Sequence, residues 1–259
     1  MIYLHVYPSY NEMSKAAAEL VSDRIRARPD SVLGLPTGDS PLGMYKQLVD
    51  RFKRGTVSFS QVTTFNLDEY IGVSDDSFLS FKRYMHEHFI SSVDLPSGSA
   101  HIPASRAFDE RQECERYERL IENAGGLDLT ILGIGINGHI GFNEPGTPWE
   151  SFTHAVELDQ STLDRLGPHI ATPPRRAITM GIRTIMLSEQ LVLMAAGNSK
   201  CHILEKALLG QIGPSVPASV LQLHPSVSVL VDSEAGAALL NQMEKERLDG
   251  LHWCVREYA

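Results

Sequence analysis

Short apolar runs alternate with longer segments of helical period along this chain, and this alternation constrains the fold more than any other feature. Each run is too short for a helix and is bounded by Gly, Pro, Asn or Asp, as is typical of strands buried in a parallel sheet. The clearest runs are residues 2–6, 32–35, 62–66, 127–132, 191–195 and 227–231. The helical segments are residues 11–26, 41–54, 78–91, 110–123 and 199–209. The pattern predicts an α/β fold with a doubly wound, largely parallel, Rossmann-like sheet and crossover helices.

The length of 259 residues suits one large domain, so we expect residues 1–259 to form a single α/β unit. Residues 146–174 are the least regular part, rich in Pro, Thr and Ser, with only a short helix expected around residues 159–166. Such a stretch in a compact domain is often a binding loop. We therefore expect a flap over the active site here.

The charge and the cysteines limit the partners and the compartment. A formal net charge of −9 argues against a nucleic-acid or membrane surface, because either would be repelled. Cys114, Cys201 and Cys254 lie far apart and form no C-x-x-C pair, so we expect reduced thiols in the cytoplasm. No secretory signal or membrane span is predicted. The oligomeric state stays open, with a homo-oligomer as one alternative.

Ligands of doubly wound sheets sit at the carboxyl ends of the strands, so the polar residues there come first. After the run 32–35 the chain reads Pro-Thr37-Gly38-Asp39-Ser40-Pro and enters a helix, with Ser40 as the expected N-cap. Free N–H groups and the helix dipole would make this turn a phosphate site. The alternative is an ordinary strand-to-helix turn, and the carboxylate of Asp39 would have to point away from a phosphate.

Two adjacent carboxylates, Asp68 and Glu69, follow the run 62–66. Successive side chains of a strand point to opposite faces, so only one of the two can face the crevice. A carboxylate in a partly dry cleft is a suitable base for a proton next to a carbonyl. The alternative is a solvated loop acid or a helix cap.

A glycine-rich segment, Gly-Ile-Gly-Ile-Asn137-Gly138-His139-Ile-Gly-Phe-Asn-Glu144-Pro-Gly, follows the run 127–132. It contains a literal G-x-G-x-x-G, but no helix opens after it, so we reject a dinucleotide site. It offers close backbone approach and a histidine whose tautomer the nearby Glu144 can set. A purely structural histidine is the alternative.

Lys200 follows the run 191–195 and is expected in the first turn of a helix. Cations are unfavourable there, so an anion held between Lys200 and the helix dipole explains it better than an exposed lysine does. His86 and His88 are two residues apart and diverge on a helix, so no metal site is expected. His224 precedes the last run and is interpreted as a turn residue.

Taken in order, LPTGDSP, TFNLDEY, GINGHIGFNEPG, AITMGI, AAGNSK and LQLHP resemble the motifs of the glucosamine-6-phosphate deaminase (isomerase) family over nearly the whole chain. The Phe-Asn-Glu-Pro continuation separates them from the related 6-phosphogluconolactonases. The resemblance implies that glucosamine 6-phosphate is isomerised and deaminated, without any cofactor, to fructose 6-phosphate and ammonia. It also implies the family's doubly wound fold.

By the same resemblance, Asp68 carries a proton between C2 and C1, and His139 opens the pyranose ring. Asn137 and Glu144 flank the histidine. The substrate-binding positions implied by the motifs, phosphate contacts included, are Thr37, Gly38, Asp39, Ser40, Glu69, Gly138 and Lys200.

The flap departs from the family pattern. The phosphate-binding arginine expected in the flap is missing, and whether Arg165 replaces it stays open. Phe152, His154 and Val156 stand where some members carry Arg or Lys to bind an activator, so no allosteric activation is expected. Three alternatives stay open: a galactosamine-6-phosphate deaminase, a lactone hydrolase and a non-catalytic sugar-phosphate sensor.

Overall fold

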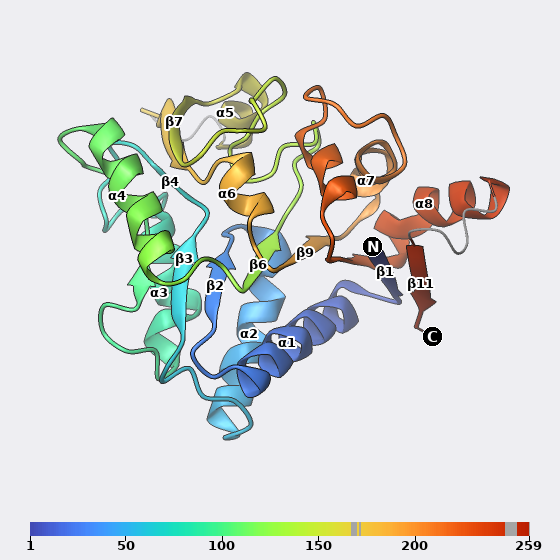
Figure 1. Ribbon diagram of the computed structural model, residues 1–259, viewed down its shortest axis with the longest axis horizontal. Helices are drawn as coiled ribbons and strands as arrows, with labels where there is room; N and C mark the ends of the chain where they lie inside the picture. Colours follow the sequence, from blue (N-terminus) through green and yellow to red (C-terminus); the bar gives the residue numbers. More distant parts are fainter. Residues whose placement is uncertain (167–169, 171, 247–252, 259) are drawn as a thin grey trace.

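A parallel sheet of eight strands forms the centre of the protein (Figure 1). The computed structural model describes residues 1–166, 170, 172–246 and 253–258. The strand order is β11-β1-β10-β9-β6-β2-β3-β5. The strands are β1 (Ile2–Tyr7), β2 (Val32–Leu35), β3 (Thr63–Asn66), β5 (Ala100–His101), β6 (Leu129–Leu132), β9 (Gln190–Ala195), β10 (Val227–Asp232) and β11 (Trp253–Glu257). The six predicted strands are thus confirmed, within two residues at each end.

Helices cover both faces of the sheet, as Figure 1 shows for α1 and α2 on one side and α6 and α7 on the other. The helices are α1 (Tyr10–Ala27), α2 (Asp39–Lys53), α3 (Phe81–His88), α4 (Glu110–Asn123), α5 (Gln160–Leu166), α6 (Ile182–Met186), α7 (Cys201–Leu208) and α8 (Ser233–Glu246). Short 3-10 turns are η1 (Ile90–Ser92), η2 (Asn198–Lys200) and η3 (Pro217–Leu223). This is the predicted doubly wound arrangement.

Two hydrophobic cores, one on each face, hold these layers together. Along β9, Leu191 and Leu193 pack into the core under α4, α6, α7 and α8, whereas Val192 and Met194 pack into the core under α1, α2 and α3. Residues on both faces of the strand are fully buried, which is why the strands are continuous apolar runs rather than alternating ones.

A second, antiparallel sheet was not predicted. It has three strands in the order β4-β8-β7, with β4 at Asp68–Tyr70, β7 at His154–Glu157 and β8 at Arg176–Thr179. Only Leu67 separates β3 from β4, so the chain leaves the main sheet there and enters the second one at Asp68. The three strands are short, and two of them lie in the irregular or unassigned parts of the sequence pattern, so periodicity gave no signal for them.

The predicted flap contains β7 and α5, and α5 is the short helix expected at residues 159–166. Its apolar residues Leu158, Leu163 and Leu166 pack with Tyr70 and Phe142 in a third, small core. Residues 167–169 and 171 and the side chain of Arg165 lie outside the described part of the chain, and so does the prediction for Arg165.

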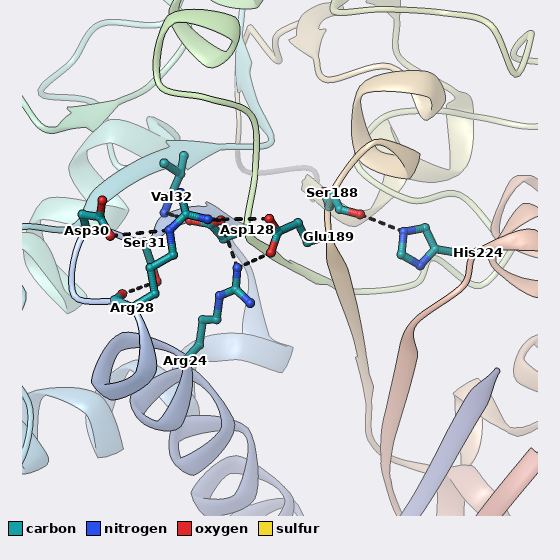
Figure 2. Close-up of polar contacts among 9 residues, drawn as sticks. All are labelled: Arg24, Arg28, Asp30, Ser31, Val32, Asp128, Ser188, Glu189 and His224. Atoms are coloured by element: carbon teal, nitrogen blue, oxygen red, sulfur yellow. Dashed lines mark hydrogen bonds and ion pairs between the residues drawn. The ribbon is translucent and has the colours of Figure 1, made fainter.

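At the amino ends of β2 and β6, a group of ion pairs ties α1 to the sheet (Figure 2). The buried carboxylate of Asp128 accepts hydrogen bonds from Arg24 at 2.9 Å, from Arg28, and from the backbone N–H of Val32 at 2.6 Å. Arg24 and Arg28 also contact Glu189. This end of the sheet is opposite to the strand ends that carry the predicted site, so the group serves stability.

We expect Asp128→Asn to lower the free energy of unfolding by about 2 to 3 kcal/mol, because two arginines lose a buried counter-charge. Unfolding of the wild type and of Asp128→Asn by denaturant measures this difference in free energy. Asp30→Asn is the matched control, since Asp30 also pairs with Arg28 but its side chain is 70% exposed. That change should cost less than about 0.5 kcal/mol. Equal stability of the Asp128→Asn chain and the wild type would contradict the prediction.

His224 lies beside this group, immediately after η3 and before β10. Its Nε2 is 2.9 Å from the carbonyl oxygen of Ser188, and its Nδ1 contacts Ser226 (Figure 2 shows the first contact). His224 thus lies in the connection before β10, where it is buried and its ring joins two backbone segments rather than forming a turn. Across the described residues, no helix is long and apolar enough to span a membrane.

Candidate active site

The candidate active site lies where the order of the strands reverses. From β2 the chain proceeds outward to β3 and β5, whereas from β6 it proceeds the other way to β9 and β10, so the crevice opens between the carboxyl ends of β2 and β6. A cleft of about 610 Å³ occupies this position. Its lining comes from four strand ends and the flap: residues 36–40, Leu67, Asp68, Tyr70, Phe81, residues 133–135, His139, Gly141, Phe142, Thr162, Leu166, Ala196, Ser199 and Lys200.

The turn after β2 presents the start of α2 to this cleft. Gly38 is the N-cap, with φ of 101°, and it makes no side-chain capping bond. The prediction that Ser40 is the N-cap is wrong: glycine adopts this positive φ without strain, so the helix begins at Asp39, two residues earlier than predicted. The first N–H groups of a helix have no partner within it, so those of Asp39 and Ser40 are available to an anion.

Lys200, at the end of η2, lines the same cleft as the turn after β2. It is the N-cap of α7 rather than a residue of its first turn, because the 3-10 turn comes before the α-helix. Its Nζ donates to the carbonyl oxygen of Ile134 at 2.7 Å and lines the cleft together with Thr37 and Ser40. The glycine-rich loop thus holds the ammonium group at the cleft.

Asp68 is the first residue of β4 and its side chain lines the cleft with only 7% of the residue exposed. Burial, with a further contribution from the charge of Glu69, raises the pKa of Asp68 from 3.8 to about 8. A carboxylate with such a raised pKa is a stronger base than an exposed one. This is the property that abstraction of a carbon-bound proton requires.

Glu69 points away from the cleft, as the alternation of strand side chains predicts. Its carboxylate accepts hydrogen bonds from the backbone N–H groups of Tyr70, Phe81 and Lys82 and from the hydroxyl of Ser80, at 2.9 to 3.0 Å. It therefore fixes the first turn of α3 against β4. The predicted contact of Glu69 with the substrate has no support in this position, which is on the far side of the strand from Asp68.

His139 and Glu144 form a pair on the loop after β6. Nδ1 of His139 is 3.1 Å from Oε2 of Glu144, and Asn137 donates to the same oxygen at 2.6 Å. Burial raises the pKa of Glu144, but hydrogen bonds from His139, Asn137 and Thr162 outweigh it, and the net effect is a lowered pKa. An ionised carboxylate only accepts, so Nδ1 carries the proton and Nε2 is left to exchange a proton in the cleft.

Two glycines explain the G-x-G-x-x-G pattern without a nucleotide. A Cβ on Gly135 would overlap the imidazole ring of His139, so the glycine lets the ring lie flat against the loop. Gly138 has φ of 88°, and its carbonyl accepts from Ala218 N at 2.9 Å. Gly138 packs against Val216 behind the loop, so its predicted role in substrate binding becomes one of shaping the loop.

The sequence analysis predicted a flap over the site, but it did not predict that Thr162 and an aromatic wall line the cleft. Thr162 on α5 is buried, lines the cleft and donates to Oε1 of Glu144 at 3.1 Å. Tyr70, Phe81 and Phe142 pack together beside Asp68, with ring centroids 4.7 to 6.1 Å apart. Phe142 could have been suspected from its place in the glycine-rich loop, but Thr162 carries no local signal.

The structure thus gathers Thr37, Gly38, Asp39, Ser40, Asp68, His139 and Lys200 around one cleft, with Asn137 and Glu144 directly behind His139. Glu69 and Gly138 lie outside it. In the described part of the chain, no group of three or more His, Cys, Asp or Glu side chains is placed to hold a metal ion. A helix start with two N–H groups that have no partner in the helix, a buried carboxylate and a histidine–carboxylate pair are the chemical parts of the site.

Comparisons with known proteins show the family to which the chain belongs. A family model described as glucosamine-6-phosphate isomerases/6-phosphogluconolactonase matches residues 9–230. The glucosamine-6-phosphate deaminases of Thermoanaerobacter pseudethanolicus and of Geobacillus sp. are each 46% identical to this chain, over 92% of it and over 95% and 96% of their own lengths.

Solved structures show the same fold. A monomeric glucosamine-6-phosphate deaminase has a TM-score of 0.88 at 43% identity and covers 92% of this chain and 100% of its own. The 6-phosphogluconolactonase of Trypanosoma brucei has a TM-score of 0.76 at 19% identity, covering 92% of this chain and 99% of its own, and so shares the fold alone.

Fold and cleft together define a doubly wound α/β protein whose cleft combines the start of a helix with acid–base side chains. More particularly, the chain belongs to the glucosamine-6-phosphate isomerase/6-phosphogluconolactonase family.

Proposed function

We propose that the protein is a glucosamine-6-phosphate deaminase, which converts glucosamine 6-phosphate and water to fructose 6-phosphate and ammonia. The observation that carries this proposal is the placement of Asp68 and the His139–Glu144 pair in one cleft with the phosphate turn. The names of the relatives at 46% identity support the same substrate. Overall, this reaction is a hydrolysis of a C–N bond.

Each part of the cleft has a step in this reaction. The phosphate binds to the N–H groups at the start of α2 and to Lys200, which places the sugar. His139, with Nε2 free, moves the proton needed to open the ring to the aldehyde. Asp68 then takes the proton from C2 to give an enolamine and returns it to C1 to give a ketimine. Water adds to the ketimine, and ammonia leaves.

The apolar wall beside Asp68 helps this chemistry. Tyr70, Phe81 and Phe142 exclude water from one side of the carboxylate, which keeps it a strong base and protects the enolamine from the solvent. No step transfers an electron pair to a cofactor, so the proposed reaction needs none. We also propose the cytoplasm as its compartment, since all three cysteines are free in the structure.

The direct test is incubation with glucosamine 6-phosphate while ammonia and ketose phosphate are measured together. Isomerisation alone would give no ammonia, and a lactonase would act only on 6-phosphogluconolactone. Equal molar amounts of ammonia and ketose phosphate are the expected result. Release of neither product, with hydrolysis of the lactone, would overturn the proposal in favour of a lactone hydrolase.

We expect kcat/KM to be at least about tenfold higher for glucosamine 6-phosphate than for galactosamine 6-phosphate. The two epimers differ only at C4, and a site that bonds one 4-hydroxyl leaves a polar group unpaired with the other, at about 1 to 3 kcal/mol. Initial rates of ammonia release at equal subsaturating concentrations measure the ratio. Faster release from galactosamine 6-phosphate would replace the proposed substrate by its epimer.

A further inference from the structure

Two tyrosines behind the phosphate turn hold its carbonyl groups. The hydroxyl of Tyr84, on α3, donates to the carbonyl oxygen of Gly38 at 2.7 Å. The hydroxyl of Tyr10, at the start of α1, donates to the carbonyl oxygen of Asp39 at 2.8 Å. Both side chains are partly buried, and neither belongs to the lining of the cleft. Their hydroxyls therefore reach the turn from the side that faces away from the ligand.

Because the peptide bond is planar, a hydrogen bond to its carbonyl oxygen also fixes the direction of its N–H group. In a trans peptide the C=O and the following N–H point in opposite directions. A hydroxyl that fixes the carbonyl of Gly38 therefore fixes the N–H of Asp39 on the other side, and one that fixes the carbonyl of Asp39 fixes the N–H of Ser40. These are the two N–H groups that the start of α2 offers to an anion.

The hydroxyl of Tyr10 bonds two backbone groups of α2. Its hydroxyl accepts from the N–H of Gly43 at 2.8 Å while it donates to the carbonyl of Asp39. Gly43 N–H and Asp39 C=O are four residues apart, the pair that a regular α-helix joins directly. A Cβ on Gly43 would lie 3.0 Å from Cε1 of Tyr10 and would overlap Ser14. Glycine inside a helix costs about 1 kcal/mol relative to alanine, and here it makes room for Ser14 and Tyr10 of α1.

Tyr84 lies on α3, the helix whose first turn is held by Glu69. Glu69 fixes the first turn of α3 next to Asp68, and Tyr84 lies one turn further along the same helix. Burial, followed by the nearby Tyr10 and the charge of Asp39, raises the pKa of Tyr84. The hydroxyl is therefore protonated, and so a donor, at any pH at which the enzyme works.

We propose that Tyr10 and Tyr84 are positioning residues for the phosphate group, whose hydroxyls hold the N–H groups of Asp39 and Ser40 toward it. This inference rests on the proposed function only in that a phosphate ester binds at the turn. Neither tyrosine touches the sugar, so their effect falls on phosphate affinity and KM rather than on kcat. Lys200, the other group proposed to bind the phosphate, is held by the carbonyl oxygen of Ile134.

The experiment compares Tyr84→Phe, Tyr10→Phe and the double variant with the wild type. Calorimetry gives the Kd of inorganic phosphate, and ammonia release from glucosamine 6-phosphate gives kcat and KM separately. Tyr258→Phe is the control, because its hydroxyl is also hydrogen-bonded, to His5 at 3.1 Å among others, but at the far edge of the sheet. Thermal unfolding of every chain reports any loss of fold.

For Tyr84→Phe we expect Kd and KM to rise about fivefold with kcat within about twofold of the wild type, as the loss of one hydrogen bond predicts. Tyr10→Phe should have a smaller effect, about twofold, since Gly43 N–H and Asp39 C=O can then bond directly. The double variant should lose at least about tenfold, because the two hydroxyls hold adjacent peptides. The control should match the wild type in all three quantities.

Unchanged phosphate affinity in the double variant would overturn the proposal, and so would a fall in kcat at constant KM. An equal loss in Tyr258→Phe, or a loss that follows the melting temperature rather than the tyrosine removed, would also overturn it. The phosphate measurement does not depend on turnover. A wild type that binds phosphate but releases no ammonia would therefore refute the proposed function while the two tyrosines are still tested.

Discussion

Asp68→Asn is expected to lower the turnover of glucosamine 6-phosphate by ~100-fold to ~10,000-fold, the usual range for loss of a general base. The amide has nearly the same size and cannot accept the C2 proton. The phosphate turn and Lys200 are untouched, so KM and the affinity for inorganic phosphate should stay within about twofold of the wild type. Steady-state rates of ammonia release measure kcat and KM.

A second readout separates the role of base from other roles of a buried carboxylate. With substrate in deuterium oxide, the wild type should exchange the C2 proton with solvent or move it to C1, whereas Asp68→Asn should do neither. Asp76→Asn is the control, because Asp76 is an exposed acid on the loop after β4. Should Asp68→Asn keep more than a tenth of the wild-type turnover, Asp68 would not be the base.

The pH dependence follows from the raised pKa of Asp68. The base form requires ionisation, so kcat/KM of the wild type should rise with pH through about 8. The sign for stability is the opposite: a carboxyl whose folded pKa is raised favours the folded state while it is protonated. That contribution is full below the ordinary value of 3.8 and is lost as pH rises through about 8. The melting temperature of Asp68→Asn, relative to that of the wild type at the same pH, should therefore increase as pH rises from 4 to about 8.

Much of the fold could be predicted because the main sheet is buried on both faces. Strands such as β9 and β10 are six residues long and mostly apolar, and α4 was predicted to the residue from its apolar spacing. The phosphate turn and the histidine loop could be located because strand ends in such a sheet meet at one edge. Locating these two segments needs only the positions of the strands in the sequence.

The rest depends on contacts between distant segments. Asp68 and Glu69 are adjacent acidic residues, and the strand pattern does not say which of them faces the cleft. Their orientation is set where the chain leaves the main sheet and enters β4. The start of α2 was misplaced because Gly38 substitutes for a side-chain cap with its positive φ. Tyr10 has no neighbour in the sequence that reveals its role, since its partner Gly43 lies beyond a whole helix and strand.

His139→Gln is the change with the second largest expected effect, a loss of ~100-fold or more in kcat on the cyclic sugar. Glutamine keeps a polar group near Glu144 but cannot exchange a proton as Nε2 does. The step that it loses is ring opening, which comes before the C2 proton is removed. The rate-limiting step therefore changes from removal of the C2 proton by Asp68 to opening of the ring.

An isotope effect detects this movement. With deuterium at C2 of glucosamine 6-phosphate, the wild type should show a clear isotope effect on kcat, because Asp68 breaks that bond. In His139→Gln the effect should shrink toward one, since ring opening does not involve C2. His202→Gln controls for the substitution, because the His202 side chain is 89% exposed and lies on α7 outside the cleft. An undiminished isotope effect in His139→Gln would mean that His139 assists the proton transfer at C2 and that another group opens the ring.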